Sequence, residues 1–158
     1  MKNIAFYAGS FDPFTNGHLQ IVKTASKTFK EVVIGLGINP SKTPRFNKEE
    51  MRKAIEDTLK EENIDNAKVI IYDNETWQAA KENNSCILIR GLRNETDYRY
   101  EEEIANYNDK HGIETIYLRA KSLGDISSSF VYKELEENKD ISSYVPREIK
   151  KLILNKRT

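Results

Sequence analysis

Apolar and polar positions alternate along the chain in two rhythms. Short runs rich in β-branched and other apolar residues predict five strands, at residues 4–7, 32–38, 68–72, 86–89 and 114–118. Elsewhere apolar residues recur every three or four positions, which predicts helices at residues 18–29, 47–59, 76–82, 96–110, 128–137 and 146–156. The second of these helices has a start signal, because Asn47 is followed three positions later by Glu50.

Strands that alternate with helices predict crossover connections and a parallel sheet covered on both faces. We therefore expect one α/β domain over residues 1–158, with a Rossmann-like, doubly wound, five-stranded parallel sheet. The last two helices, at about residues 128–156, are expected to pack on this domain. In such sheets a ligand binds beyond the carboxyl ends of the strands, near the switch in strand order. The residues that follow each strand are thus the candidates for chemistry.

Composition narrows the class of protein. The chain has 158 residues, 38% of them apolar and 32% charged, typical of one well-solvated domain. The 25 basic and 25 acidic residues cancel, which argues against a nucleic-acid binder. One cysteine, Cys86, and two histidines, His18 and His111, allow neither an internal disulfide nor a zinc set, so a reducing, cytoplasmic setting is expected. No apolar run approaches the roughly 20 residues of a membrane span, so no membrane partner is expected.

The loop after the first strand carries the first candidate site. It has the sequence GSFDPFTNGH at residues 9–18, whose glycines and Asp-Pro step predict a fixed turn. Gly17 is expected to let backbone approach a ligand. His18 opens the following helix, whose N-terminus suits a phosphate group. The alternative is a tight turn in which His18 only caps the helix or packs.

Three further loops have features that suit phosphates. After the second strand, Lys42 lies between two prolines and Arg45 follows the second of them. Arg90 and Arg93 flank Gly-Leu after the fourth strand, and residues 126–129 begin a helix with three serines. Taken singly, each has a structural alternative: solvated loop charges, ion pairs of Arg90 and Arg93 with Asp97 and Glu101, and an ordinary serine cap. Together they gather positive potential at one edge of the sheet, which favours a ligand with several phosphates, such as a nucleoside triphosphate.

Motifs of other nucleotide enzymes are missing. The only G-x-G, at residues 35–37, lies inside a strand, and no Walker-type loop occurs, which argues against NAD enzymes and P-loop ATPases. No nucleophile constellation stands out, and Cys86 is predicted inside a buried strand. Asp12, Asp97 and Glu101 are too few for a protein-built metal cage. The pattern favours in-line displacement at a phosphoryl group, with Mg²⁺ arriving on the nucleotide phosphates and none held by protein side chains.

These motifs resemble those of a known family. The segment with Thr15 and His18 resembles the T/H-x-G-H motif of the nucleotidyltransferase superfamily. The R-G-L-R sequence at residues 90–93, the Tyr100–Glu101 pair after it, and I-S-S-S at residues 126–129 are similar in order and spacing to the bacterial-type phosphopantetheine adenylyltransferases. The resemblance extends over nearly the whole chain.

The resemblance implies an enzyme of coenzyme A synthesis. Such an enzyme transfers the adenylyl group of ATP to 4′-phosphopantetheine, requires Mg²⁺, and gives dephospho-coenzyme A and pyrophosphate. The resemblance also implies a homohexamer, in which coenzyme A competes at the same site as feedback.

It further implies roles for individual residues. His18 would stabilise the transition state at the α-phosphate, and Lys42, near that phosphate, would with Arg90 orient the acceptor's phosphate. Thr76 would contact the pantetheine arm, and Ser10 would touch both the nucleotide and the acceptor phosphate. The remaining contacts to ATP would come from Phe11, Gly91, Leu92, Arg93, Glu101, Leu123, Gly124, Asp125, Ile126, Ser127, Ser128 and Ser129.

The chain departs from the family pattern at three places. The E-E-x-R spacing at residues 49–52 is one residue longer than in the family, so Arg52 is not taken as a site residue. Ala8 stands where the family usually has proline, and residues 123–125 replace a segment that usually carries an aromatic side chain. Asp125 would bring negative charge near the β- and γ-phosphates, from which either weaker ATP binding or a bridging Mg²⁺ is expected. Two alternatives stay open: a relative that uses CTP or another phosphorylated acceptor, and a non-catalytic nucleotide- or coenzyme A-binding protein.

Overall fold

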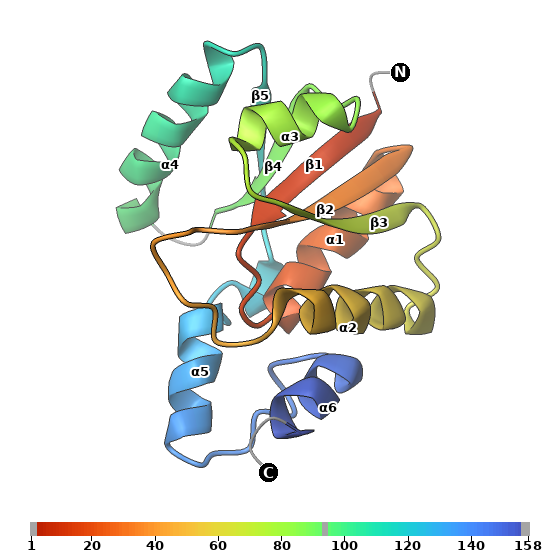
Figure 1. The fold of residues 1–158 in the computed structure, drawn as a ribbon, viewed down its shortest axis with the longest axis vertical. Coiled ribbons are helices and arrows are strands. Elements are labelled where there is room, and N and C mark those ends of the chain that lie inside the picture. The colour runs from red at the N-terminus through yellow and green to blue at the C-terminus, as the bar shows by residue number, and fades with distance from the viewer. Residues whose placement is uncertain (1–2, 93–94, 156–158) are drawn as a thin grey trace.

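Five parallel strands form the centre of the molecule (Figure 1). The computed structural model describes residues 3–92 and 95–155. The strands are β1 (Ile4–Gly9), β2 (Glu31–Gly37), β3 (Ala67–Tyr72), β4 (Ile87–Gly91) and β5 (Glu114–Leu118). They pair in the order β3-β2-β1-β4-β5 with every pair parallel, which confirms the predicted doubly wound sheet. The strand order reverses between β1 and β4, so a ligand site is expected at the carboxyl ends of these two strands.

The helices follow the predicted order, and their ends differ from the predicted ones by at most two residues. They are α1 (Asn16–Thr28), α2 (Lys48–Glu61), α3 (Thr76–Glu82), α4 (Glu95–Asp109), a short 3₁₀ turn (Lys121–Leu123), α5 (Ser128–Glu136) and α6 (Arg147–Asn155). Asn47 caps α2 as expected, because its side chain accepts the N–H of Glu50 at 3.0 Å. Cys86 corrects a prediction: it precedes β4 and is exposed rather than buried in the strand.

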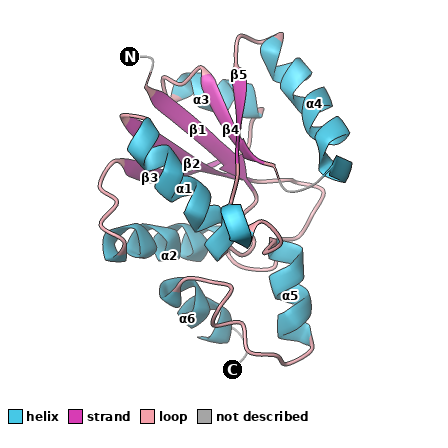
Figure 2. Ribbon diagram, turned by 180° about the vertical axis from the view of Figure 1, so that it is seen from behind, coloured by secondary structure: helices cyan, strands magenta, loops and turns pink. Residues whose placement is uncertain are grey.

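Both faces of the sheet are covered, and the pleat divides the core accordingly. From β1, Ala5 and Tyr7 join the apolar cluster that holds the buried faces of α1 and α2, whereas Phe6 and Ala8 join a second cluster with residues of α3. Seen from behind, α1 lies in front of the sheet and α3 beyond it (Figure 2). Gly35, the first glycine of the G-x-G motif, leaves room for the Phe6 ring, since a Cβ at Gly35 would lie 2.4 Å from that ring.

Helix α4 buries polar side chains and leaves two of its tyrosines in solvent. Tyr100 and Tyr107 are 65% and 46% exposed. The buried residues of its described part are Glu101, Ala105 and Asn108. The carboxylate of Glu101 is thus buried on α4 because it pairs with Arg90 in the site described below. No helix in the described ranges is long and apolar enough to cross a membrane.

Candidate active site

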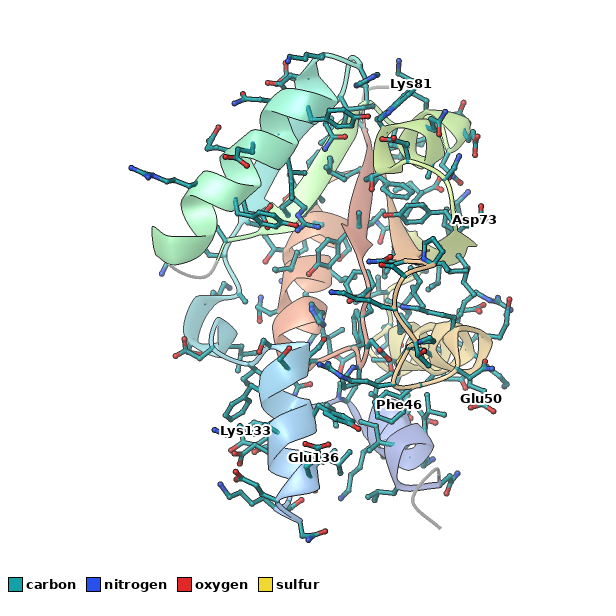
Figure 3. All side chains as sticks on the ribbon, turned by 60° about the vertical axis from the view of Figure 1, so that its left-hand side comes forward. Phe46, Glu50, Asp73, Lys81, Lys133 and Glu136 are labelled. Carbon is teal, nitrogen blue, oxygen red and sulfur yellow. The ribbon has the colours of Figure 1, made fainter. Side chains whose placement is uncertain are left out.

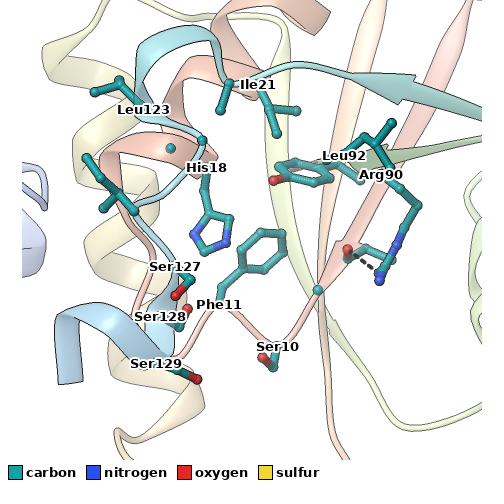
Figure 4. Close-up of a pocket in the computed structure, with 18 of the residues that line it drawn as sticks. Ser10, Phe11, His18, Ile21, Arg90, Leu92, Leu123, Ser127, Ser128 and Ser129 are labelled. Atoms are coloured by element: carbon teal, nitrogen blue, oxygen red, sulfur yellow. Dashed lines mark hydrogen bonds between the residues drawn. The ribbon is translucent and has the colours of Figure 1, made fainter. Parts of the chain in front are cut away.

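A cavity of about 280 Å³ opens at the carboxyl ends of β1 and β4, where the strand order reverses (Figure 4). Its walls come from the loop after β1, the start of α1, the end of β4, α4 and the segment before α5. The lining residues are Tyr7, Ala8, Gly9, Ser10, Phe11, Gly17, His18, Ile21, Arg90, Gly91, Leu92, Glu101, Ala120, Leu123, Gly124, Ile126, Ser127, Ser128 and Ser129.

Most residues predicted for the site line this one cavity. They are Ser10, Phe11, His18, Arg90, Gly91, Leu92, Glu101, Leu123, Gly124, Ile126, Ser127, Ser128 and Ser129. Lys42, Thr76 and Asp125 are not among its lining residues. Asp125 is exposed, so the structure does not bring its charge into the cavity wall. Arg93 lies outside the described residues.

The orientation of the His18 ring is set by the turn before it. The backbone N–H of Thr15 donates to His18 Nδ1 at 2.9 Å, and Thr15 Oγ1 accepts the N–H of His18 at 3.3 Å, which together form a capping box. Because Nδ1 accepts a hydrogen bond, the neutral ring carries its proton on Nε2, on the side away from Thr15. The Phe11 ring packs edge-on against His18, with centroids 4.9 Å apart. His18 therefore both takes part in the cap of α1 and lines the cavity.

Gly17 lines the cavity and also lets two segments of backbone approach each other. A Cβ there would lie 2.9 Å from the carbonyl oxygen of Leu123 and 3.0 Å from that of Ile126. The hydroxyl of Thr15 donates to the same Ile126 carbonyl at 3.0 Å. The start of α1 is thus joined to the segment before α5, which brings His18 and the three serines to one cavity.

Arg90 is held by a buried carboxylate. Its Nε and Nη2 donate to the two oxygens of Glu101 at 3.0 and 2.8 Å, and its Nη1 donates to the Ala8 carbonyl at 3.2 Å. Burial lowers the pKa of Arg90, but the paired carboxylate more than offsets this, so the pKa lies above its ordinary value. Three of its five N–H groups are used, and two remain without an acceptor among the described residues. The side chain is therefore oriented and still able to bind a phosphate.

The three serines before and within α5 differ in availability. Ser127 caps the helix by accepting the N–H of Phe130 at 3.0 Å, and Ser128 donates to the Pro13 carbonyl at 2.7 Å. The hydroxyl of Ser129 has no partner in the described ranges. Nor do the backbone N–H groups of Ser128 and Ser129, which form the first turn of α5 beside the cavity. This helix start offers N–H donors and a partial positive charge to an anion.

Lys42 and Thr76 stand apart from the cavity wall. Lys42 is exposed between β2 and α2, and its ammonium has no partner within the described part of the chain. Thr76 begins α3, where its hydroxyl hydrogen-bonds with that of Tyr72 at 3.1 Å. Burial is the main cause that raises the pKa of Tyr72 above its ordinary value. Lys42 follows β2 and Thr76 follows β3, and these two strands lie on the same side of β1.

Sequence reasoning missed the apolar and aromatic part of the wall. Tyr7, Ile21 and Ala120 line the cavity and were not singled out. Ile21 could have been found, because it stands one helical turn after His18 and must share its face. Tyr7 could not, since a strand residue near a loop gives no local signal of cavity exposure. No group of three or more metal-binding side chains occurs among the described residues.

Comparisons with known proteins agree with this geometry. The fold and its cavity at the reversal of strand order are those of a nucleotidyltransferase, and the family model described as cytidylyltransferase-like matches residues 6–149. A curated relative from Lachnoclostridium phytofermentans, named phosphopantetheine adenylyltransferase, is 40% identical over 156 residues, which cover 97% of this chain and 94% of the relative. The chain therefore belongs to the phosphopantetheine adenylyltransferase family within the cytidylyltransferase-like nucleotidyltransferases, and the predicted resemblance is confirmed.

A solved structure supports the fold. A protein from Vibrio parahaemolyticus, described as a putative nicotinate-nucleotide adenylyltransferase, superposes with a TM-score of 0.73. The match covers 98% of this chain and 93% of that one, at 20% sequence identity. At this identity the likeness concerns the fold, which is the predicted Rossmann-like arrangement.

Proposed function

We propose that this protein transfers the adenylyl group of ATP to 4′-phosphopantetheine, and releases pyrophosphate and dephospho-coenzyme A. The observation that carries the proposal is the joining of an oriented His18, an oriented Arg90 and the open start of α5 around one cavity. The relative at 40% identity, by its name, supports the choice of acceptor.

In the proposed reaction a phosphate oxygen of the acceptor attacks the α-phosphate of ATP in line with the departing pyrophosphate. Negative charge grows on the equatorial oxygens of the α-phosphate in the transition state. His18 would donate from Nε2 to one of them, since its Nδ1 is occupied by the Thr15 N–H. Because the ring is already oriented, this donor costs no reorganisation during the reaction.

The remaining groups would hold the two substrates. Arg90 and Lys42 would bind the acceptor's phosphate, and Ser10 would contact it from the loop after β1. The N–H groups of Ser128 and Ser129 would bind the outer phosphates of ATP at the start of α5. Mg²⁺, which we expect on those phosphates, would supply charge neutralisation of the leaving pyrophosphate. We further propose a cytoplasmic homohexamer in which coenzyme A competes for the same cavity.

Pyrophosphate release from MgATP, with and without 4′-phosphopantetheine, tests the proposal. Release that requires both substrates is the expected result, and CTP in place of ATP serves as the control for nucleotide choice. Release with CTP, or only with another phosphorylated acceptor, would transfer the assignment to a related nucleotidyltransferase. ATP binding without any release would indicate a non-catalytic binding protein.

His18→Ala tests the proposed transition-state donor. Loss of one oriented donor is expected to lower turnover by about 10²–10³. His111→Ala is the matched control, because His111 is the only other histidine and stacks on Trp77 outside the cavity lining. Turnover of His18→Ala within about tenfold of the control would remove His18 from the proposed mechanism.

A further inference from the structure

Asp12 joins two segments that are far apart in the sequence. Its Oδ2 accepts the backbone N–H of Arg45 at 2.7 Å, and its Oδ1 accepts that of Phe46 at 3.0 Å. In return, Arg45 Nη1 donates to the Asp12 carbonyl at 3.0 Å. Lys48 Nζ donates to the Ser10 carbonyl at 2.6 Å, with its pKa lowered by burial although the charge of Asp12 acts in the opposite sense. Both carboxylate oxygens of Asp12 are therefore engaged in binding backbone.

Within residues 3–92 and 95–155, the segment just before this junction makes hydrogen bonds only within itself. We call residues 39–44 the arm; all of them are exposed. Its internal hydrogen bonds run from Ser41 and from the Lys42 N–H back to Asn39. After the arm, Phe46 is buried in the main apolar cluster and lies between α5 and α2 (Figure 3), and the Arg45 guanidinium stacks over the Tyr132 ring at 4.7 Å.

The position of the arm thus depends on where the chain is held at residues 45 and 46. Lys42 is three residues before Arg45, a span of at most about 11 Å even in extended chain. The place where Arg45 is held therefore limits where Lys42 can lie. The loop that carries Asp12 also leads to His18, so Asp12 connects the segment before α1 with the segment that follows the arm.

We propose that Asp12 is a positioning residue, which fixes the arm bearing Lys42 relative to the loop bearing His18. The proposal rests on the proposed function for the role of Lys42. A carboxylate is suited to this task because it only accepts hydrogen bonds, at two oxygens, and can satisfy two adjacent N–H groups at once. Asparagine cannot replace it, since its amide nitrogen would turn a donor toward one of those N–H groups.

The first test is a double-mutant cycle with Asp12→Asn and Lys42→Ala. Asp12→Asn is expected to lower kcat/KM for 4′-phosphopantetheine about tenfold, with KM for ATP changed less than about twofold. In the Lys42→Ala background the same substitution is expected to have no further effect, because Asp12 acts through Lys42. An equal loss in both backgrounds would overturn the proposal.

Asp140→Asn is the matched control. Asp140 also accepts a backbone N–H, that of Ser142 at 2.9 Å, but it lies in the connection between α5 and α6, away from the cavity lining. Its kinetic constants are expected to equal those of the wild type. Asp12→Glu, which keeps the charge and displaces the carboxylate by one methylene, is expected to fall between Asp12→Asn and the wild type, and serves if Asp12→Asn folds poorly.

Hydrogen exchange decides the proposal even if the proposed function fails. Should the wild type release no pyrophosphate with 4′-phosphopantetheine, the function is wrong, but the junction is still measurable. In Asp12→Asn the amides of Arg45 and Phe46 are expected to exchange at least tenfold faster, while the buried amides of α1 keep their rates. Unchanged exchange at residues 45 and 46 would overturn the positioning role.

Discussion

Arg90 and Lys42 carry the same charge toward the same proposed phosphate, yet the protein holds them in opposite ways. Arg90 lies in the cavity wall, and its side chain is 26% exposed against a Glu101 side chain that is 9% exposed. Lys42 is exposed on the arm, and its ammonium has no partner in the described chain. One cation is oriented before any substrate arrives, and the other must be ordered when it binds.

This difference teaches how orientation and stability are connected. Ordering a long cationic side chain costs about 1.5–2 kcal/mol, which folding has already met for Arg90 and which substrate binding must meet for Lys42. The cavity wall is therefore ordered in one geometry, and substitutions in it should lower the stability of the fold. Substitutions in the arm should lower turnover without changing stability. The following substitutions test that division, from the largest expected effect on stability to the smallest.

Arg90→Ala is expected to destabilise the protein most. It leaves the carboxylate of Glu101 buried without a partner, which costs about 3 kcal/mol, at the low end for buried pairs because Arg90 is partly exposed. Urea denaturation measures the change in the free energy of unfolding. The double variant Arg90→Ala with Glu101→Ala should recover part of the loss. No recovery would mean that Arg90 stabilises the fold by packing and not through its carboxylate.

Gly17→Ala tests the junction in the wall between α1 and the segment before α5. The new methyl group would lie about 3 Å from the carbonyl oxygens of Leu123 and Ile126, so backbone must shift, at a cost of about 1–3 kcal/mol. Gly124→Ala is the matched control, because the nearest atom to its Cβ is 3.6 Å away, an ordinary contact. Equal stability of the two variants would show that the close approach at Gly17 relaxes without cost.

Much of this wall can be predicted from local sequence, but its detailed geometry cannot. The strand-helix alternation defines the sheet, and the residues after β1 and β4 are expected at one edge for topological reasons alone. An ion pair between Arg90 and Glu101 is one of the alternatives that the sequence offers, and the hydrogen bonds confirm it. Its two-oxygen geometry and the burial of Glu101 depend on how α4 packs, which no local pattern gives. A glycine such as Gly17 signals a close approach without saying which groups approach, and the predicted burial of Cys86 is wrong because burial at a strand end depends on the covering helix.

Glu101→Gln sharpens the comparison between Arg90 and Lys42, because it removes the negative charge that pairs with Arg90 and retains the shape of the side chain. One acceptor oxygen remains, so the expected loss of stability is about 1–2 kcal/mol, less than for Arg90→Ala. Glu134→Gln is the matched control, since its partner Lys139 is 56% exposed and such surface pairs contribute little. Thermal unfolding of the two variants measures the difference. A loss no larger than that of Glu134→Gln would make the Arg90 pair equivalent to a surface pair.

Lys42→Ala is expected to have the smallest effect on stability and a large one on the reaction. Because the ammonium has no partner in the described chain, the free energy of unfolding should change by less than about 0.5 kcal/mol. Turnover with 4′-phosphopantetheine should fall by at least about tenfold, since one cation that binds the reacting phosphates is lost. Lys121→Ala, another exposed lysine with no pairing in the described ranges, is the control and should retain wild-type turnover. If Lys42→Ala destabilises the protein as Arg90→Ala does, the arm is part of the folded wall. If it changes neither stability nor turnover, Arg90 alone binds the acceptor's phosphate.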